Sequence, residues 1–565
     1  MSWIQPIRKN NLSQPTRWWA GAYAAFAVSM GLVACGGGGG DASPANVAAS
    51  TDTTNVSEVS ATVAAAEDAK IMLALEDETA IENEESRKAC KDRNNNTFKK
   101  LLTCVTLDNV RAHQLKLQNI AVANGGTRVS GTKGFDDSAD YAEKVFKDAG
   151  YNVTRQSFQF QSFIELPGTN LSQVTPTPTA AIETNILSYS GSGSVTATVS
   201  TLPTVTGCNT ADFAGFTSGN IALISRGACP FSAKATNAKA AGASAVVIYN
   251  NAAGELNGTL GAEFSLNISV TGIELAVGQK LAAIPGLVLS ISTSTLRGTA
   301  TTSNVIAESK GGDADNVVMV GAHLDSVDAG GGIQDNGTGS AAVLEVAKQM
   351  ANVKTTNKVR FALWGAEESG LVGSTNYVKT LPEADKNKIA LYLNFDMIGS
   401  PNHVFFIYDG DNSDGVGAGP GPVGSTGIEK TFEAFYSKRN ISFKGTDFDG
   451  RSDYGPFIAA GIPAGGLFTG AEGTKTVAEA EVWGGIVGTA YDPCYHKACD
   501  NYGNVNLFAL DINSDAVAYA TLQFAMSTKV VNGIKGKPVG QGQAFVKRAA
   551  TDVPKWKHVP EHFEQ

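Results

Sequence analysis

Asn316-Val-Val-Met-Val-Gly-Ala-His323 opens the stretch of sequence that decides the fold, and this stretch runs to Ile398. Two more apolar runs follow at Lys358–Trp364 and Ile389–Phe395, and a segment with helical apolar spacing, 339–350, lies between the first two runs. Strand, helix and strand within about forty residues predict a parallel crossover unit. We therefore predict an α/β domain whose mixed, mainly parallel central sheet carries helices on both faces.

Each of the three predicted strands leads into residues of the kinds that bind metal ions. His323 and Asp325 follow the first strand, Glu367 and Glu368 the second, and Asp396 the third. Ligands of open α/β sheets bind beyond the carboxyl ends of the strands, so we expect these side chains to converge. One histidine meeting several carboxylates indicates a zinc site.

A pair of zinc ions requires one bridging carboxylate, two further protein ligands for each ion, and another carboxylate that takes a proton from water. The chain offers His323, Asp335, Glu367, Glu368, Asp396 and His496. Glu367 and Glu368 are adjacent, and neighbouring side chains of extended backbone point in opposite directions, so one could bind metal while the other faces the water. Asp335 lies in a predicted tight turn before the helix.

The length and composition indicate a large globular protein. A chain of 565 residues is expected to hold several domains, with 42% hydrophobic and 17% charged residues. The net charge of −10 argues against nucleic acid as a partner. After the N-terminal segment no apolar run is long enough to span a membrane.

Residues 1–35 have the pattern of a lipoprotein-type signal peptide. Basic residues precede the apolar run 18–33, which ends in Leu32-Val-Ala-Cys35. This ending resembles a bacterial lipobox, which implies cleavage before Cys35 and lipidation of its thiol; an ordinary signal peptide is the alternative. Residues 36–88 read as a flexible tether. We expect an exported protein, either an outer-membrane lipoprotein or a periplasmic or extracellular enzyme.

The cysteine count agrees with export. Without Cys35 six cysteines remain, which can form three disulfides in an oxidising compartment. Proximity in sequence suggests Cys90–Cys104, Cys208–Cys229 and Cys494–Cys499, although six cysteines allow fifteen pairings. The last pair would close a small loop around His496 and fix its imidazole.

The composition changes between about residues 167 and 301, where Gly, Thr and small apolar residues dominate. Ile221–Phe231 reads as a strand and turn, followed by a small-residue helix at 232–242 and the strand Ala243–Asn250. This segment resembles a protease-associated (PA) domain, a non-catalytic insert of several exopeptidase families. We assign residues 181–297 to it, with substrate gating, interaction or simple spacing as its role.

Five motifs in order carry a second resemblance. They are Gly321–Ser326, Gln334–Ala341, Trp364–Ser374, Asn394–Gly399 and Asp492–His496. Together they resemble the M28 family of di-zinc exopeptidases, most closely its secreted bacterial aminopeptidases, over about residues 105–165 and 301–530. The resemblance implies a zinc exopeptidase fold for residues 89–180 and 298–530, followed by a polar tail at 531–565.

The family implies a role for each matching residue. Asp335 would bridge two Zn²⁺ ions, His323 and Asp396 would complete one site, and Glu368 and His496 the other. Glu367 would be the general base. Asp325 would orient His323, and the Tyr495 hydroxyl would stabilise the oxyanion. The substrate would contact Arg451, Met397 and Phe468, with a plain salt bridge as the alternative for Arg451.

Two further features follow from the same resemblance. A cis peptide bond is expected between Asp335 and Asn336. Asp511 and Asp515 match positions where some relatives bind structural Ca²⁺, but those relatives add an acidic N-terminal residue at a position where this chain has Cys104. Calcium is therefore the less favoured alternative.

We predict a zinc-dependent exopeptidase that removes N-terminal residues from peptides by attack of an activated water, with Glu367 as general base. Carboxypeptidase or glutaminyl cyclase chemistry at the same site stays open, as does an inactive binding protein whose PA domain holds a partner. Peptides are the expected partners, and a membrane is contacted only through a lipid anchor. We expect a monomer, although the sequence leaves the oligomeric state open.

Overall fold

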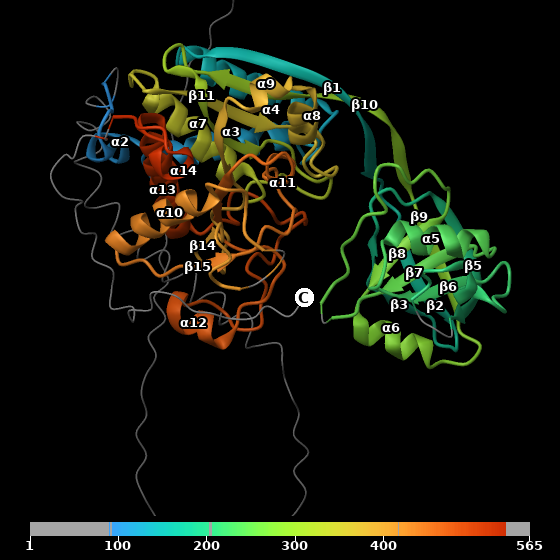
Figure 1. The fold of residues 1–565 in the computed structure, drawn as a ribbon. Helices are drawn as coiled ribbons and strands as arrows, with labels where there is room; N and C mark the ends of the chain where they lie inside the picture. Colours follow the sequence, from blue (N-terminus) through green and yellow to red (C-terminus); the bar gives the residue numbers. More distant parts are fainter. Residues whose placement is uncertain are drawn as a thin grey trace, which may run out of the picture. The chain divides into compact units, whose positions relative to one another are not determined.

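The structure is a computed structural model that describes residues 90, 93–202, 206–252, 254–415, 417, 419–537 and 539 (Figure 1). The predicted signal peptide, the tether and Cys35 lie outside these residues. Within the described part of the chain, no helix combines the length and the apolar character needed to cross a membrane.

A mixed eight-stranded sheet forms the centre of the fold, in the order β1-β10-β12-β11-β13-β16-β14-β15. Its strands are β1 (Asn152–Glu165), β10 (Thr295–Glu308), β11 (Asp313–His323), β12 (Asn357–Trp364), β13 (Ile389–Phe395), β14 (Phe406–Tyr408), β15 (Lys444–Thr446) and β16 (Ala464–Phe468). The three strands predicted first are β11, β12 and β13, and β11 pairs in parallel with both others. The register places His323 beside Trp364, so both strands end at one edge.

Helices cover both faces of this sheet because alternate strand residues point to opposite sides. Val318 and Val320 of β11 join one apolar cluster, whereas Val317 and Met319 join another. The first cluster includes residues of α2 (Phe98–Cys104), α3 (Leu107–Ala123), α4 (Lys133–Asp148), α7 (Gly337–Met350), α10 (Ser425–Lys438) and α13 (Leu507–Met526). The second includes residues of α8 (Val372–Thr380) and α11 (Gly455–Ala459). The predicted α/β class is confirmed.

Helices α13 and α14 (Lys529–Asn532) follow the last strand of the central sheet. Helix α13 starts at Leu507, where the Asn506 side chain caps it by accepting a hydrogen bond from the Ala509 amide. This helix is buried on nearly all sides and therefore lacks the one-sided apolar stripe of a surface helix. Residue 530, the predicted end of the domain, lies inside α14, whose Val531 is buried.

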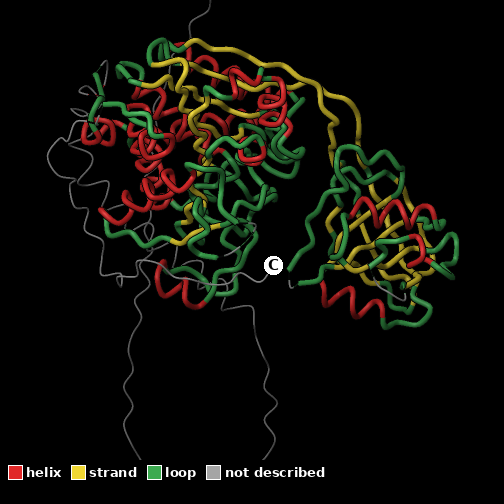
Figure 2. Tube along the Cα trace, viewed as in Figure 1, coloured by secondary structure: helices red, strands yellow, loops and turns green. Residues whose placement is uncertain are grey.

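A second eight-stranded sheet has the order β3-β2-β9-β5-β6-β7-β8-β4. Its strands are β2 (Asn170–Thr175), β3 (Ala180–Ile182), β4 (Asn185–Ile186), β5 (Gly193–Thr201), β6 (Ile221–Ser225), β7 (Ala245–Tyr249), β8 (Ser269–Ile273) and β9 (Val288–Thr293), with helices α5 (Phe231–Ala240) and α6 (Leu275–Ala282). All of them lie in sequence between β1 and β10, which pair antiparallel along their full length (Figure 2). The sheet starts at Asn170, before the predicted boundary at 181.

The described residues contain three disulfides, and they join the pairs that proximity in sequence suggested. Cys90–Cys104, Cys208–Cys229 and Cys494–Cys499 have Cα atoms 5.6, 5.8 and 5.3 Å apart. The third closes the short loop that contains His496. The bridge at Cys104 ties the segment before α2 to that helix.

Gly339 in α7 is required by a close backbone approach, since a Cβ atom there would overlap the Phe395 carbonyl oxygen at the end of β13. We expect Gly339→Ala to lower the free energy of unfolding in urea by about 1–3 kcal/mol, as overpacking does in well-packed cores. Gly311→Ala is the matched control, because a Cβ atom there meets nothing within 4 Å. Equal stability of the two variants would show that α7 can move away from β13.

Candidate metal centre

The candidate site lies where β11, β12 and β13 end. His323 is the last residue of β11, Glu367 and Glu368 follow β12, and Asp396 follows β13. The shared edge of three parallel strands therefore brings together side chains from three separate motifs, as the sequence predicted. Loops outside the sheet add Asp335, which precedes α7, and His496.

Asp335 lies between the two histidines. Its Oδ1 is 3.1 Å from His323 Nε2, and its Oδ2 is 3.3 Å from His496 Nε2. The peptide bond between Asp335 and Asn336 is cis, as expected. The Asn336 side chain donates to the Phe395 carbonyl and accepts from the Met397 amide, so it fixes the backbone on both sides of Asp396.

Each histidine has a second carboxylate next to it. His323 Nε2 is 3.2 Å from Asp396 Oδ1, and His496 Nε2 is 3.1 Å from Glu368 Oε2. The two imidazoles and three carboxylates thus form two groups that share Asp335. This grouping is the one that the resemblance implied.

The separation of Glu367 from Glu368 has a different origin from the one predicted. The two residues lie in a turn after β12 rather than in extended backbone, and Ala366 before them has a left-handed φ of 55°. The turn directs Glu368 towards His496 and leaves Glu367 Oε2 3.9 Å from His323 Nε2. The Glu367 amide donates to Asp325 Oδ1, which holds the turn against the end of β11.

The electrostatics of the site favour a bound cation. Burial opposes the charged imidazolium, yet the pKa of His323 is raised well above its ordinary value because Asp396 and Glu367 are close. Burial also opposes the charge of His496, whose pKa is likewise raised by Glu368 and Asp335. The same negative potential attracts a divalent ion.

The donor atoms also fit zinc. Ligand atoms of His323, Glu367 and Asp396 lie within 4.8 Å of one another, as do those of His323, Asp335 and Glu368. Asp396 Oδ1 and Glu368 Oε1 are buried without a hydrogen-bond partner, which is costly unless another group binds them. Imidazole nitrogens with carboxylate oxygens are typical zinc ligands.

The residues predicted to surround the ligands lie close by. Asp325 faces His323 Nδ1 with its backbone oxygen at 3.2 Å and its carboxylate at 3.7 Å. The Tyr495 ring stacks on His496, and the Tyr495 oxygen accepts a hydrogen bond from Arg451. Arg451 also forms an ion pair with Glu472.

The two proposed pocket residues lie at the ends of neighbouring strands. Met397 comes after β13 and Phe468 ends β16, which pairs with β13. Their role in the substrate pocket stays a prediction. Calcium binding by Asp511 and Asp515 also stays a prediction; Asp515 forms an ion pair with Arg439.

Two other features of the described chain differ from this centre. Asp409, Asp411 and Glu429 form an acidic group, but these carboxylates accept backbone N–H hydrogen bonds, and Lys430 pairs with Asp411 and Glu429.

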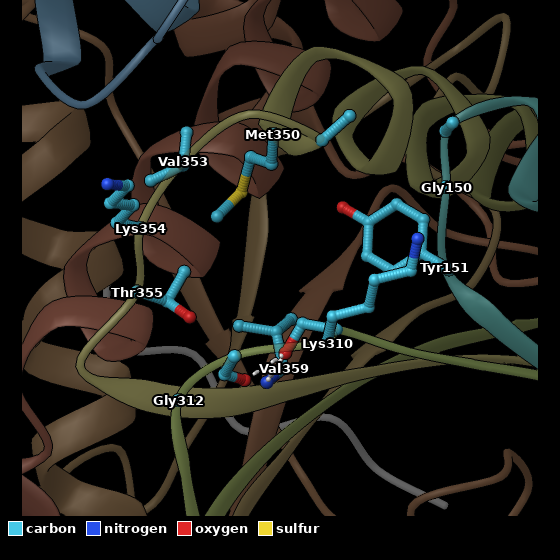
Figure 3. Close-up of a pocket in the computed structure, with 13 residues that line it drawn as sticks. Gly150, Tyr151, Lys310, Gly312, Met350, Val353, Lys354, Thr355 and Val359 are labelled. Atoms are coloured by element: carbon cyan, nitrogen blue, oxygen red, sulfur yellow. Dashed lines mark hydrogen bonds between the residues drawn. The ribbon is translucent and has the colours of Figure 1, made fainter.

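A cavity of about 370 Å³ opens at the opposite ends of β11 and β12 (Figure 3). No imidazole or carboxylate is among its lining residues, so it offers no metal ligands of these kinds.

The sequence interpretation missed three residues that hold the site in place. Ser452 donates to Asp396 Oδ2 at 2.6 Å, Asp500 accepts from the amides of Gln334 and Asp335, and Arg128 binds the loops after β11. Ser452 directly follows Arg451 and Asp500 directly follows Cys499, two residues that the sequence analysis had singled out. Arg128 lies far from every motif and gave no local signal.

Comparisons with known proteins identify the family. The sequence profile of peptidase family M28 matches residues 304–521, and that of the PA domain matches residues 193–281. An aminopeptidase of Pseudomonas aeruginosa is 44% identical over 475 residues, which cover 80% of this chain and 88% of that protein. A probable lipoprotein aminopeptidase of Mycobacterium tuberculosis is 42% identical, with 76% and 87% covered.

Solved structures give the same assignment. An aminopeptidase from Aneurinibacillus sp. strain AM-1 superposes with a TM-score of 0.61 at 28% identity, over 80% of this chain and 99% of that one. A zinc aminopeptidase from Bacillus subtilis gives 0.54 at 25% identity, over 74% and 94%. Sequence identity across most of both chains, the matching profile and the shared fold together show that this protein belongs to peptidase family M28 and carries an inserted PA domain.

Proposed function

We propose that this protein is a zinc-dependent aminopeptidase that hydrolyses the first peptide bond of its substrates at the centre around Asp335. The observation that carries the proposal is the position of Asp335, whose two oxygens face His323 and His496. A carboxylate in that position suits a bridge between two metal ions. The similarity to enzymes that are named aminopeptidases supports the reaction.

Two Zn²⁺ ions are the proposed cofactor. Asp335 would bridge them, His323 and Asp396 would bind one ion, and Glu368 and His496 the other. When bound, the ions supply Lewis-acid activation of a water molecule and of the substrate carbonyl.

Glu367 is the proposed general base. Burial raises the pKa of its carboxyl well above the usual range, and neighbouring carboxylates add to the rise while His323 opposes it. A carboxylate with a raised pKa accepts a proton from water near neutral pH and can return it to the leaving amine. The Asp325 carboxylate accepts a hydrogen bond from the backbone amide of Glu367 and so holds Glu367 in place.

Tyr495 is the proposed donor to the oxyanion that forms at the substrate carbonyl. Its oxygen accepts a hydrogen bond of 3.2 Å from Arg451, so its own O–H is left to donate. A fixed donor of this kind stabilises the developing charge without reorganisation. We propose that Arg451, Met397 and Phe468 contact the substrate, whose amino group would lie near Asp396 and Glu367.

Export and lipidation of Cys35 form part of the proposal. The lipobox-like Leu32–Cys35 and the similarity to a relative named a probable lipoprotein support lipidation. Three disulfides support an oxidising compartment.

The reaction is tested with purified protein on leucine p-nitroanilide, the same compound with a blocked amino group, a peptide blocked only at its amino end, and a peptide with N-terminal glutamine. We expect cleavage only of substrates with a free amino group, and loss of that cleavage after zinc is chelated. Release of C-terminal residues from the blocked peptide would indicate a carboxypeptidase. Formation of pyroglutamate without hydrolysis would indicate a glutaminyl cyclase.

Glu367→Gln keeps the shape of the side chain but removes the base. We expect turnover to fall by about 10²–10⁴-fold, the usual contribution of a positioned base, while the zinc content of the purified protein stays at that of the parent. Zinc is measured by atomic absorption. Glu383→Gln in the exposed helix α9 (Glu383–Lys386) is the control and should behave like the parent. A variant with full activity would remove Glu367 from the mechanism.

Ser452→Ala removes the hydroxyl that donates to Asp396 and accepts from Asn394. We expect zinc affinity to fall by about 10–100-fold, because groups that orient a metal ligand contribute on this scale. Titration of zinc-stripped protein against a coloured chelator measures the affinity. Ser437→Ala, at an exposed position of α10, should leave it unchanged. Unchanged affinity in Ser452→Ala would mean that Asp396 is held without this hydrogen bond.

A further inference from the structure

Arg128 is a buried cation that belongs to none of the five motifs. It lies in the loop between α3 and α4, has no exposed surface, and precedes the region matched by the family profile. Burying a guanidinium is costly unless its donors are bound. The partners of this side chain therefore indicate its role.

Its guanidinium binds the backbone at two points of the loop between β11 and α7, which follows His323 and carries Asp335. Nε donates to the Gly331 carbonyl at 2.8 Å and one terminal nitrogen to the Gly332 carbonyl at 2.6 Å. The other terminal nitrogen donates to the carbonyl of Leu324, which lies between His323 and Asp325. One rigid, planar group thus joins the end of β11 to the turn that leads into Asp335.

The main chain of the same loop makes further contacts with the site. The Arg128 amide donates to Ser326 Oγ at 2.8 Å, and the Ser326 amide donates back to the Arg128 carbonyl. Two residues further on, Ser130 Oγ accepts from the Ala366 amide at 2.7 Å, directly before Glu367. The loop 128–130 therefore contacts the ends of both β11 and β12.

The turn before Asp335 is also held by the carboxyl group of Asp500. Asp500 accepts hydrogen bonds from the Gln334 amide at 2.8 Å and the Asp335 amide at 3.1 Å. The turn is too tightly packed for a side chain at Gly332, since a Cβ atom there would lie 2.5 Å from Ser326 Cβ and 2.6 Å from the Asp335 carbonyl oxygen. The Arg128 guanidinium on the carbonyls and the Asp500 carboxyl group on the amides together fix this turn.

Burial lowers the pKa of Arg128 to about 10, with nearby carboxylates, first among them Asp325, opposing the change. The side chain is therefore still charged at neutral pH. The positive charge lies near the carboxylates of the site, but the hydrogen bonds described above go to carbonyl oxygens and not to those carboxylates. It can offset the repulsion between the carboxylates while leaving their oxygens available.

We infer that Arg128 is a positioning residue of the metal centre, which holds His323 and Asp335 at the separation that metal binding requires. The inference rests on the proposed function, because it takes those two residues as ligands. Arg128 makes no contact with substrate in this role. It acts on zinc affinity through the two parts of the β11–α7 loop that it joins.

The test compares the zinc affinity of the parent with that of Arg128→Met and Arg128→Lys, by competition of zinc-stripped protein with a coloured chelator. We expect Arg128→Met to weaken affinity by about 10–100-fold, the range found for groups that orient metal ligands. Arg128→Lys keeps the charge but cannot span three carbonyls in one plane, so its loss should be smaller. The activity of each variant at saturating zinc should recover in part.

Arg360→Met is the matched control, because Arg360 is also largely buried but pairs with Glu308, away from the site. A purely structural role would lower the unfolding temperature of zinc-stripped Arg128→Met and Arg360→Met alike, with zinc affinity unchanged in both. Folded Arg128→Met with the parent's affinity would overturn this inference alone. If that variant does not fold, unchanged affinity in Arg128→Lys overturns it. A parent that binds no zinc would overturn the proposed function as well.

Discussion

The crowding of ionisable groups around Asp335 is the constraint on which the rest of the structure depends. Carboxylates that are buried within a few ångströms of one another repel, and water is not there to screen them. Burial would raise the pKa of Asp335, but hydrogen bonds from His323 and His496 outweigh this effect and keep its pKa below the ordinary value. Such a cluster persists only where the surrounding backbone leaves the side chains no alternative position.

The fold meets this requirement with elements that are far apart in the chain. Three parallel strands end together and bring their terminal residues to one edge. The side chains of Arg128 and Asn336 donate hydrogen bonds to backbone carbonyls, and that of Asp500 accepts one from a backbone amide, which fixes the segments that follow β11 and β13. The candidate metal centre is thus built on rigid strand ends, and the loops contribute only where they are tied down.

The PA domain is inserted at a point of the chain that does not disturb the three strand ends of the site. Its strands lie in sequence between β1 and β10, which pair with each other along their full length. The insertion therefore falls between two strands at the margin of the central sheet and leaves β11, β12 and β13 uninterrupted. A long insert is tolerated at such a point because it separates no residues that must meet at the site.

The sequence by itself determined the fold class, the three central strands and the histidine and carboxylate residues at their ends, because hydrophobic periodicity and motif order are local properties. It also suggested the three disulfide pairs, since each closes a short loop. Only the tertiary structure decided how Glu367 and Glu368 diverge, because that depends on a left-handed turn at Ala366 rather than on strand geometry. The same holds for Arg128, whose proposed role arises from hydrogen bonds to carbonyls about two hundred residues away, and a backbone acceptor leaves no mark in the sequence.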